Sequence, residues 1–86
     1  MTEREVQLLG FERESYSDFD GDHYYYSYEI ARGFGFISSA SDDVTNDDWF
    51  VEFFDSWPTI RFTDFGEVQA LINLIEKRVV RDESTR

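Results

Sequence analysis

The chain has 86 residues, enough for one domain with a single hydrophobic core. It contains nine Phe, five Tyr and two Trp, and an apolar fraction of 41% predicts a folded protein despite a net charge of −11. It has no cysteine, so disulfides and thiolate sites are excluded.

The ends of the chain and its hydropathy indicate where the protein works. The charged start "MTEREVQ" has no apolar leader, and no apolar run is long enough to cross a bilayer. We therefore expect a cytoplasmic protein without membrane contact, folded as a single domain over residues 1–86. The last residues, 81–86, are expected to be a frayed tail.

The first third of the sequence predicts two antiparallel strands joined by a tight turn. The stretch "EVQLLGFERESYS", residues 5–17, mixes apolar and charged residues in partial alternation, which is typical of a strand with one wet face. The pair Asp20-Gly21 is a strong hairpin signal. The following "YYYSYEIA" then alternates and places the tyrosines at positions 24, 26 and 28 on one face.

The middle of the sequence predicts further strands around an acidic loop. Gly33 and Gly35 indicate a bulge or bend that ends one strand or begins another. The stretch "SASDDVTNDD" is rich in turn residues and acids. It is followed by a strand pattern in "WFVEFF", residues 49–54, and by a short continuation or further strand in "TIRFT".

The C-terminal third predicts one helix. Asp64 is a suitable N-cap, and Glu67 stands three residues later, as in a capping box. Apolar residues then recur at helical spacing and form a stripe: Phe65, Val68, Leu71, Ile72, Ile75 and Val79. The predicted fold class is therefore α+β, a small curved antiparallel sheet of three to five strands with one C-terminal helix packed on it.

The negative charge is concentrated in the middle of the sequence. Residues 14–55 hold eleven acidic residues and one arginine, so they carry −10 of the total −11, whereas residues 56–86 are neutral. Acidity that served only solubility or salt adaptation would be spread over every element, including the predicted helix. The one-sided distribution favours a docking surface for a basic partner.

Patterns for metal binding and catalysis are poorly matched. Aligning Gly21 with the glycine of a calcium-binding EF-hand loop puts Asp18 and Asp20 at ligand positions, but the first and last ligand positions then lack a carboxylate. The single histidine, His23, is expected at the surface near the hairpin end. There is no nucleophile elbow and no glycine-rich phosphate loop. We therefore predict no metal, no cofactor and no enzymatic activity.

Two short stretches resemble a nucleic-acid-binding family. "RGFGFI", residues 32–37, fits the RNA-binding signature K/R-G-F/Y-G/A-F-V with isoleucine in the last place. It is similar to the first nucleic-acid motif of cold-shock domains, and "DWFVEF", residues 48–53, resembles their second with Glu52 in place of the usual His. The resemblance covers about a quarter of the chain. It implies that single-stranded bases stack on four rings, Phe34, Phe36, Phe50 and Phe53.

The charge of that segment opposes phosphate binding and favours imitation of nucleic acid. Alternate residues of a strand stand about 6.7 Å apart, close to the roughly 6.8 Å of two base steps along one DNA strand. The leading hypothesis is a small non-enzymatic inhibitor or decoy, of the phage anti-defence or toxin-immunity type, that docks on a nuclease or another basic nucleic-acid-binding protein. The alternatives are a structural or regulatory domain whose acidity serves solubility or salt adaptation, and a cold-shock-like single-strand binder.

The predicted partner-binding residues are acids of the middle segment and three aromatic anchors. They are Asp18, Asp20, Asp22, Glu29, Asp42, Asp43, Asp47, Asp48, Glu52, Asp55, Trp49, Tyr24 and Tyr26. The leading hypothesis predicts no direct contact with nucleic acid. An aromatic sheet face left uncovered would also suit a second copy, so a homodimer is a further expectation.

Overall fold

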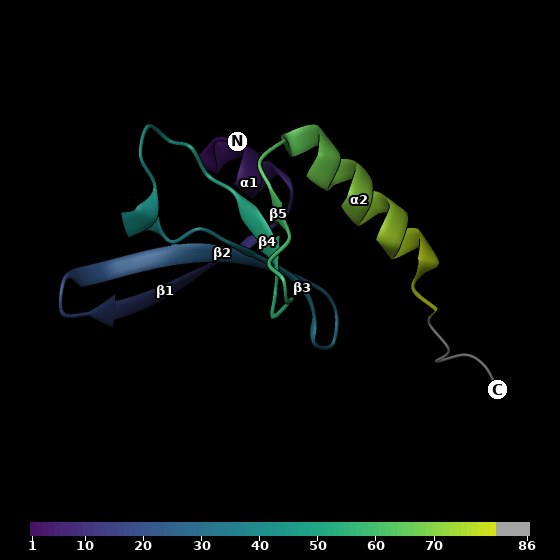
Figure 1. Cartoon of the computed structure of the whole chain (residues 1–86), viewed down its shortest axis with the longest axis horizontal. Coiled ribbons are helices and arrows are strands. Elements are labelled where there is room, and N and C mark those ends of the chain that lie inside the picture. Colours follow the sequence, from purple (N-terminus) through teal and green to yellow (C-terminus); the bar gives the residue numbers. More distant parts are fainter. Residues whose placement is uncertain (81–86) are drawn as a thin grey trace.

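The computed structural model describes residues 1–80 and contains an antiparallel sheet with a helix before it and a helix after it (Figure 1). In chain order the elements are α1 (Glu3–Leu8), β1 (Glu12–Asp18), β2 (Gly21–Ala31), β3 (Phe34–Ser38), the 3-10 turn η1 (Ser41–Asp43), β4 (Val51–Phe53), β5 (Arg61–Phe62) and α2 (Phe65–Arg78). The strands pair in the order β1-β2-β3-β4-β5, each antiparallel to the next. The predicted α+β architecture is confirmed, and the predicted tail, 81–86, lies outside the described residues.

The first element is a helix, so the strand predicted over residues 5–17 begins too early. Thr2 accepts a hydrogen bond from the backbone N–H of Glu5, and the Glu5 carboxylate accepts one from the backbone N–H of Thr2. This reciprocal capping box satisfies two N–H groups that a helix start leaves without partners. The strand itself starts only at Glu12, after a turn at Gly10.

The longest strand pair is the β1–β2 hairpin, which extends away from the rest of the sheet (Figure 1). Asp18 pairs with Gly21, so the two loop residues are Phe19 and Asp20, one position earlier than the predicted Asp-Gly turn. Gly21 has a φ of +115°, a conformation that glycine adopts without strain. Every residue of β1 is exposed, and Phe19 at the tip is not covered by any other residue of the described part, 1–80, with an exposed fraction of 108%.

One face of the sheet is covered by both helices and forms the core. Tyr26 on β2 accepts a hydrogen bond from Gln7 of α1, and its hydroxyl donates to Glu3 at 2.7 Å. Two residues further along the same face, the Tyr28 hydroxyl donates to Glu76 of α2 at 2.5 Å. The residues buried between the helices and the sheet are Val6, Phe11, Tyr26, Ile30, Phe36, Trp49, Val51, Val68 and Ile72.

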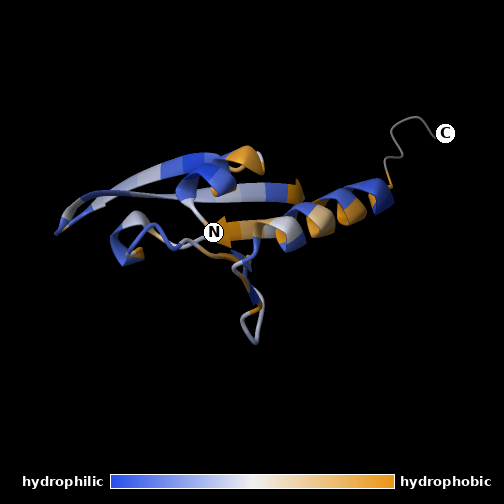
Figure 2. Cartoon of the chain, turned by 90° about the horizontal axis from the view of Figure 1, so that it is seen from above, coloured by the Kyte–Doolittle hydropathy of each residue, from blue (hydrophilic) through white to orange (hydrophobic). Residues whose placement is uncertain are grey.

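The helix α2 is the element that the sequence predicts most completely. Asp64 is its N-cap and accepts a hydrogen bond from the backbone N–H of Glu67 at 2.9 Å. Val68 and Ile72 are buried against the sheet, while Leu74 is 49% exposed. Figures 1 and 2 both show the C-terminal part of α2 extending past the sheet, at the opposite end of the molecule from the β1–β2 hairpin. Apolar and polar residues alternate around this helix in Figure 2.

Candidate functional site: an acidic sheet face

The acidic loop folds back onto the end of the β1–β2 hairpin, and His23 joins the two. Its Nε2 lies 3.0 Å from Oδ1 of Asp18 on β1, and its Nδ1 lies 3.9 Å from Oδ2 of Asp42 in η1. The Ser41 hydroxyl holds the loop there by accepting a hydrogen bond from the backbone N–H of Tyr24. The side chain of His23 is only 10% exposed, so the prediction that it lies at the surface is wrong. Two acidic segments distant in sequence therefore form one negative cluster.

The aspartates at the hairpin tip are fixed by local hydrogen bonds. Asp18 accepts a hydrogen bond from the backbone N–H of Asp20 at 2.9 Å, which closes the turn. On the other side of the ladder, the Ser17 hydroxyl donates to Asp22 at 2.6 Å. These contacts hold the backbone while the outer carboxylate oxygens remain exposed to solvent.

Three of these groups are close enough to offer atoms to a metal ion. One ligand atom each from Asp18, Asp20 and His23 lie within 4.8 Å of one another. Asp18, however, is already hydrogen-bonded to the ring of His23 and to the turn backbone. The arrangement is explained by the hairpin turn itself, and we assign no metal to it.

The face of the sheet opposite the helices is acidic along β1 and β2. Glu12 pairs with Ser27 and Glu14 pairs with Tyr25, so these side chains share the face that continues to Glu29. The Ser27 hydroxyl donates a hydrogen bond to Glu14 at 3.1 Å. Glu12 and Glu14 are absent from the predicted site, although their alternation with Asp18 along a single strand was a visible signal. We call Glu12, Glu14, Asp18, Glu29 and Asp42 the acidic face.

Aromatic rings at the hairpin end lie within this negative field. The ring of Tyr16 packs on that of His23 at 5.5 Å between centroids and on that of Tyr25 at 6.1 Å. Burial and then the carboxylates of Asp42 and Asp18 raise the pKa of the Tyr16 hydroxyl above its ordinary value. The negative field that raises this pKa also attracts cations to the same surface.

One carboxylate of the sheet already has a cationic partner. Arg61 on β5 contacts Oε2 of Glu52 through Nε at 2.8 Å and through Nη2 at 2.6 Å. The same guanidinium lies 3.9 Å from the centroid of the Phe50 ring. Glu52 is therefore neutralised within the fold, and the group shows how this sheet holds an arginine, between a carboxylate and an aromatic face.

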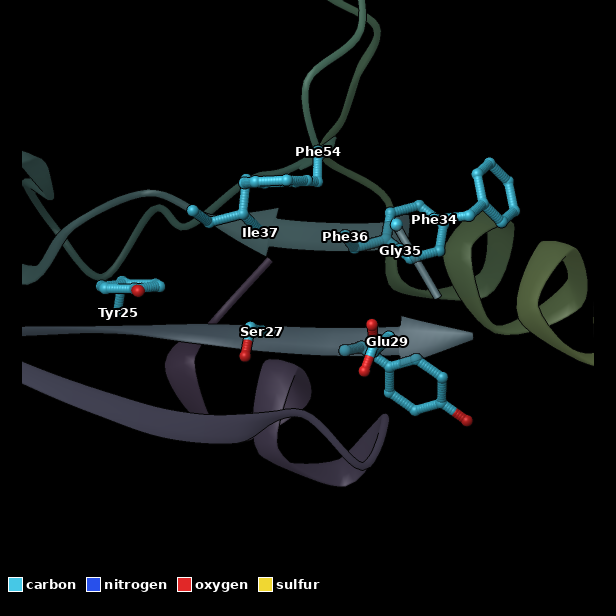
Figure 3. Close-up of a pocket in the computed structure, with 10 residues that line it drawn as sticks. Tyr25, Ser27, Glu29, Phe34, Gly35, Phe36, Ile37 and Phe54 are labelled. Carbon is cyan, nitrogen blue, oxygen red and sulfur yellow. The ribbon is translucent and has the colours of Figure 1, made fainter. Parts of the chain in front are cut away.

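A shallow hollow of about 240 Å³ opens beside this group, over β2 and β3 (Figure 3). Glu29 pairs with Gly35, and the backbone carbonyl of Gly35 accepts a hydrogen bond from the N–H of Phe54, so the three residues form a row across the sheet. Gly35 lies in the middle of this row and lines the hollow with backbone alone, since it has no side chain. A Cβ at this position would lie 2.2 Å from the backbone oxygen of Tyr28, so no other residue fits there without moving the backbone. The Glu29 carboxylate and the exposed ring of Phe54 thus lie on either side of Gly35, and the Phe54 ring extends over Ile37 (Figure 3).

Of the remaining predicted acids, Asp43 lies beside Asp42 and adds to the negative field at Tyr16, whereas Asp47, Asp48 and Asp55 do not join the acidic face. Asp47 accepts a hydrogen bond from the backbone N–H of Glu3, and Asp48 lies 3.9 Å from the amino group of Met1, so both serve the contact with the N-terminal segment. Asp55 lies in the β4–β5 turn with a φ of +60°, and Asp43 is exposed in η1. The predicted array of acids is therefore split into separate groups.

The structure places the predicted aromatic anchors in or near the core. Trp49 and Tyr26 are 3% and 2% exposed and pack edge to face. Tyr24 is half-buried, stacks on Trp49 and carries the Arg13 guanidinium at 3.7 Å from its ring centroid. Trp49 and Tyr26 therefore hold the fold together and are covered, and of the three rings only Tyr24 keeps part of its surface exposed.

The rings that resemble cold-shock motifs lie on different faces. Phe36 is 2% exposed and stacks on Phe53 at 4.8 Å, on the helix-covered face. Phe34 continues this stack, whereas Phe50 lies on the opposite face beneath Arg61. A shared exposed platform for bases, as stacking recognition requires, is therefore not formed by these four rings.

Within residues 1–80 no helix combines the length and the apolar character needed to cross a membrane. No protein-family model, no curated protein and no solved structure matches this chain.

Proposed function

We propose that this protein is a small non-enzymatic interaction module whose acidic face docks on a basic nucleic-acid-binding protein and occupies its nucleic-acid site. The observation that carries the proposal is the meeting of Asp18 and Asp42 at His23, beside a strand that presents Glu12 and Glu14. Of the two arginines within the strands, Arg13 lies on the helix-covered face and Arg61 is paired with Glu52. The acidic face thus attracts cations that the strands do not supply.

The spacing along β1 supports imitation of a nucleic-acid strand. Glu12, Glu14 and Asp18 are separated by even numbers of residues on one strand, so their positions repeat at multiples of about 6.7 Å. Phosphates two steps apart along a DNA strand are separated by roughly 6.8 Å along the axis. A basic groove that contacts every second phosphate would meet carboxylates at a similar repeat.

The hollow at Gly35 supplies a position for one basic side chain of the partner. Its two walls, Glu29 and Phe54, repeat the chemistry by which Glu52 and Phe50 hold Arg61. Neighbouring strands are about 4.8 Å apart, so the walls are separated by about 10 Å across the glycine. This gap suits the flat guanidinium of an arginine or the ammonium of a lysine.

The proposal is tested with the chain immobilised as bait, captured proteins identified by mass spectrometry, and duplex DNA added as competitor. The double variant Glu12→Gln/Glu29→Gln removes two charges from the acidic face. The control Asp48→Asn/Asp55→Asn removes two charges that lie off the acidic face. We expect DNA and salt to displace the captured protein. The acidic-face variant should bind it about tenfold more weakly, about 1.4 kcal/mol, and the control within about twofold of wild type.

Three outcomes would contradict the proposal. If the two double variants weaken binding equally, the charge acts as a bulk property, as the solubility alternative requires. If captured proteins are indifferent to DNA, the acidic face does not imitate nucleic acid. Retention of single-stranded DNA or RNA by the chain in a filter-binding assay at moderate salt would favour the cold-shock-like alternative.

A further inference from the structure

α2 carries a second pattern beside its core-facing stripe, and Leu71 belongs to both. Glu67, Leu71, Leu74 and Arg78 follow one another at spacings of four, three and four residues. This is the spacing of the contact seam in a coiled coil, so the four side chains lie along one face of the helix. Leu74 is 49% exposed. Leu71 is half-buried and packs against the edge of the core that Val68 and Ile72 fill. We call these four residues the outer stripe.

The outer stripe of one copy is complementary to the outer stripe of a second copy whose α2 runs antiparallel to the first. In an antiparallel pair of α2 helices related by a two-fold axis, Leu71 of one copy lies opposite Leu74 of the other. The same register places Glu67 opposite Arg78, so each end of the contact joins a carboxylate to a guanidinium. Neither of these two residues takes part in an ion pair within residues 1–80.

The charge distribution of the molecule allows self-association through this surface. Two copies with a net charge of −11 repel each other wherever their acidic faces meet. Within α2, two acids, Glu67 and Glu76, are balanced by Lys77 and Arg78. The β1–β2 hairpin lies at the other end of the molecule (Figure 1), so contact through α2 keeps the two acidic faces apart.

We infer that two copies of this chain associate through the outer stripe, with their α2 helices antiparallel. A helix of 14 residues is roughly 21 Å long, so the contact is smaller than the standard interface of about 1,600 Å². The dimer is therefore weak and in exchange with the monomer. The association leaves both acidic faces open, so it does not depend on the proposed function.

Sedimentation velocity from about 10 μM to 1 mM tests the inference. We expect the weight-average mass to rise from 10.2 kDa towards twice that value as concentration increases. Leu74→Glu should keep the chain monomeric. The control Leu8→Glu changes an exposed leucine of α1, off the stripe, and should leave association unchanged. Circular dichroism checks that each variant is folded.

Charge reversal tests the antiparallel register. Glu67→Arg and Arg78→Glu each place like charges opposite one another and should weaken association about tenfold. The double variant restores opposite charges at both ends and should associate within about twofold of wild type. A mass that stays at 10.2 kDa up to 1 mM would overturn the inference. So would a double variant as weak as the single ones, or a Leu8→Glu variant as monomeric as Leu74→Glu.

Discussion

The β1–β2 hairpin and α2 leave the same sheet in opposite directions, and they stabilise themselves by different means. β1 buries none of its residues and depends on its seven backbone pairs with β2, whereas α2 buries Val68 and Ile72 and is capped by Asp64. The hairpin carries the acids and α2 is neutral. A hairpin strand that buries no side chains can carry clustered like charges, because its charged side chains face water and replace no apolar packing. The comparison shows that a small fold can carry a strong negative electrostatic field on an element that takes little part in the hydrophobic core.

The largest loss of stability is expected at Gly35, in the sheet between the two regions. A Cβ there would lie 2.2 Å from the backbone oxygen of Tyr28, so Gly35→Ala must move the strand. We expect the free energy of unfolding to fall by about 3 kcal/mol in urea denaturation. The control Gly33→Ala meets no atom within 4 Å but retains a φ of +76°, so it should cost about 1 kcal/mol. Equal losses at both positions would contradict the close contact.

The contrast between the two regions is measured most directly by truncating one apolar side chain in each. Ile72→Ala in α2 removes a side chain that is 4% exposed and should cost about 2 kcal/mol. Phe19→Ser at the hairpin tip removes a fully exposed ring and should change stability by less than about 0.5 kcal/mol. Thermal unfolding of both variants checks this difference. A comparable loss at Phe19 would mean that the tip packs against something.

The smallest effect concerns the hydrogen bond that ties α2 to β2. The contact with Glu76 and then burial raise the pKa of Tyr28 from 10.0 to about 12. A raised pKa means that the stabilisation is complete below pH 10 and is lost as the pH rises towards 12. Tyr28→Phe should therefore cost about 1 kcal/mol at neutral pH and should show a smaller decline in stability between about pH 10 and 12. Equal declines would show that other groups cause the alkaline loss.

The elements that the sequence predicts correctly are those specified by local chemistry. The helix from Phe65 has both a cap and six apolar residues at helical spacing, and the β1–β2 hairpin has a glycine where the turn needs a positive φ. The helix α1 was missed because six residues are too few for a periodic pattern to stand out. Its signal was the pair Thr2 and Glu5, whose spacing is that of a capping box.

The candidate site is less accessible to sequence reasoning because it depends on contacts between distant segments. The acids of the hairpin were predicted, but no local pattern states that Asp42 folds back to the ring of His23. Trp49 and Tyr26 are predicted as anchors because the sequence pattern of an aromatic residue in a strand is the same whether its side chain faces water or a helix. Their burial follows from the position of α1, which was itself not predicted.

The edge position of β1 has a consequence for how the protein behaves when concentrated. An uncovered strand of seven residues offers backbone groups that could pair with a neighbouring molecule and extend the sheet without limit. Glu12, Glu14 and Asp18 place negative charge along that edge, so two such strands repel before they can pair. The carboxylates proposed to attract a basic partner therefore also act as gatekeepers against fibril growth, and neutralising them should make the protein prone to aggregation.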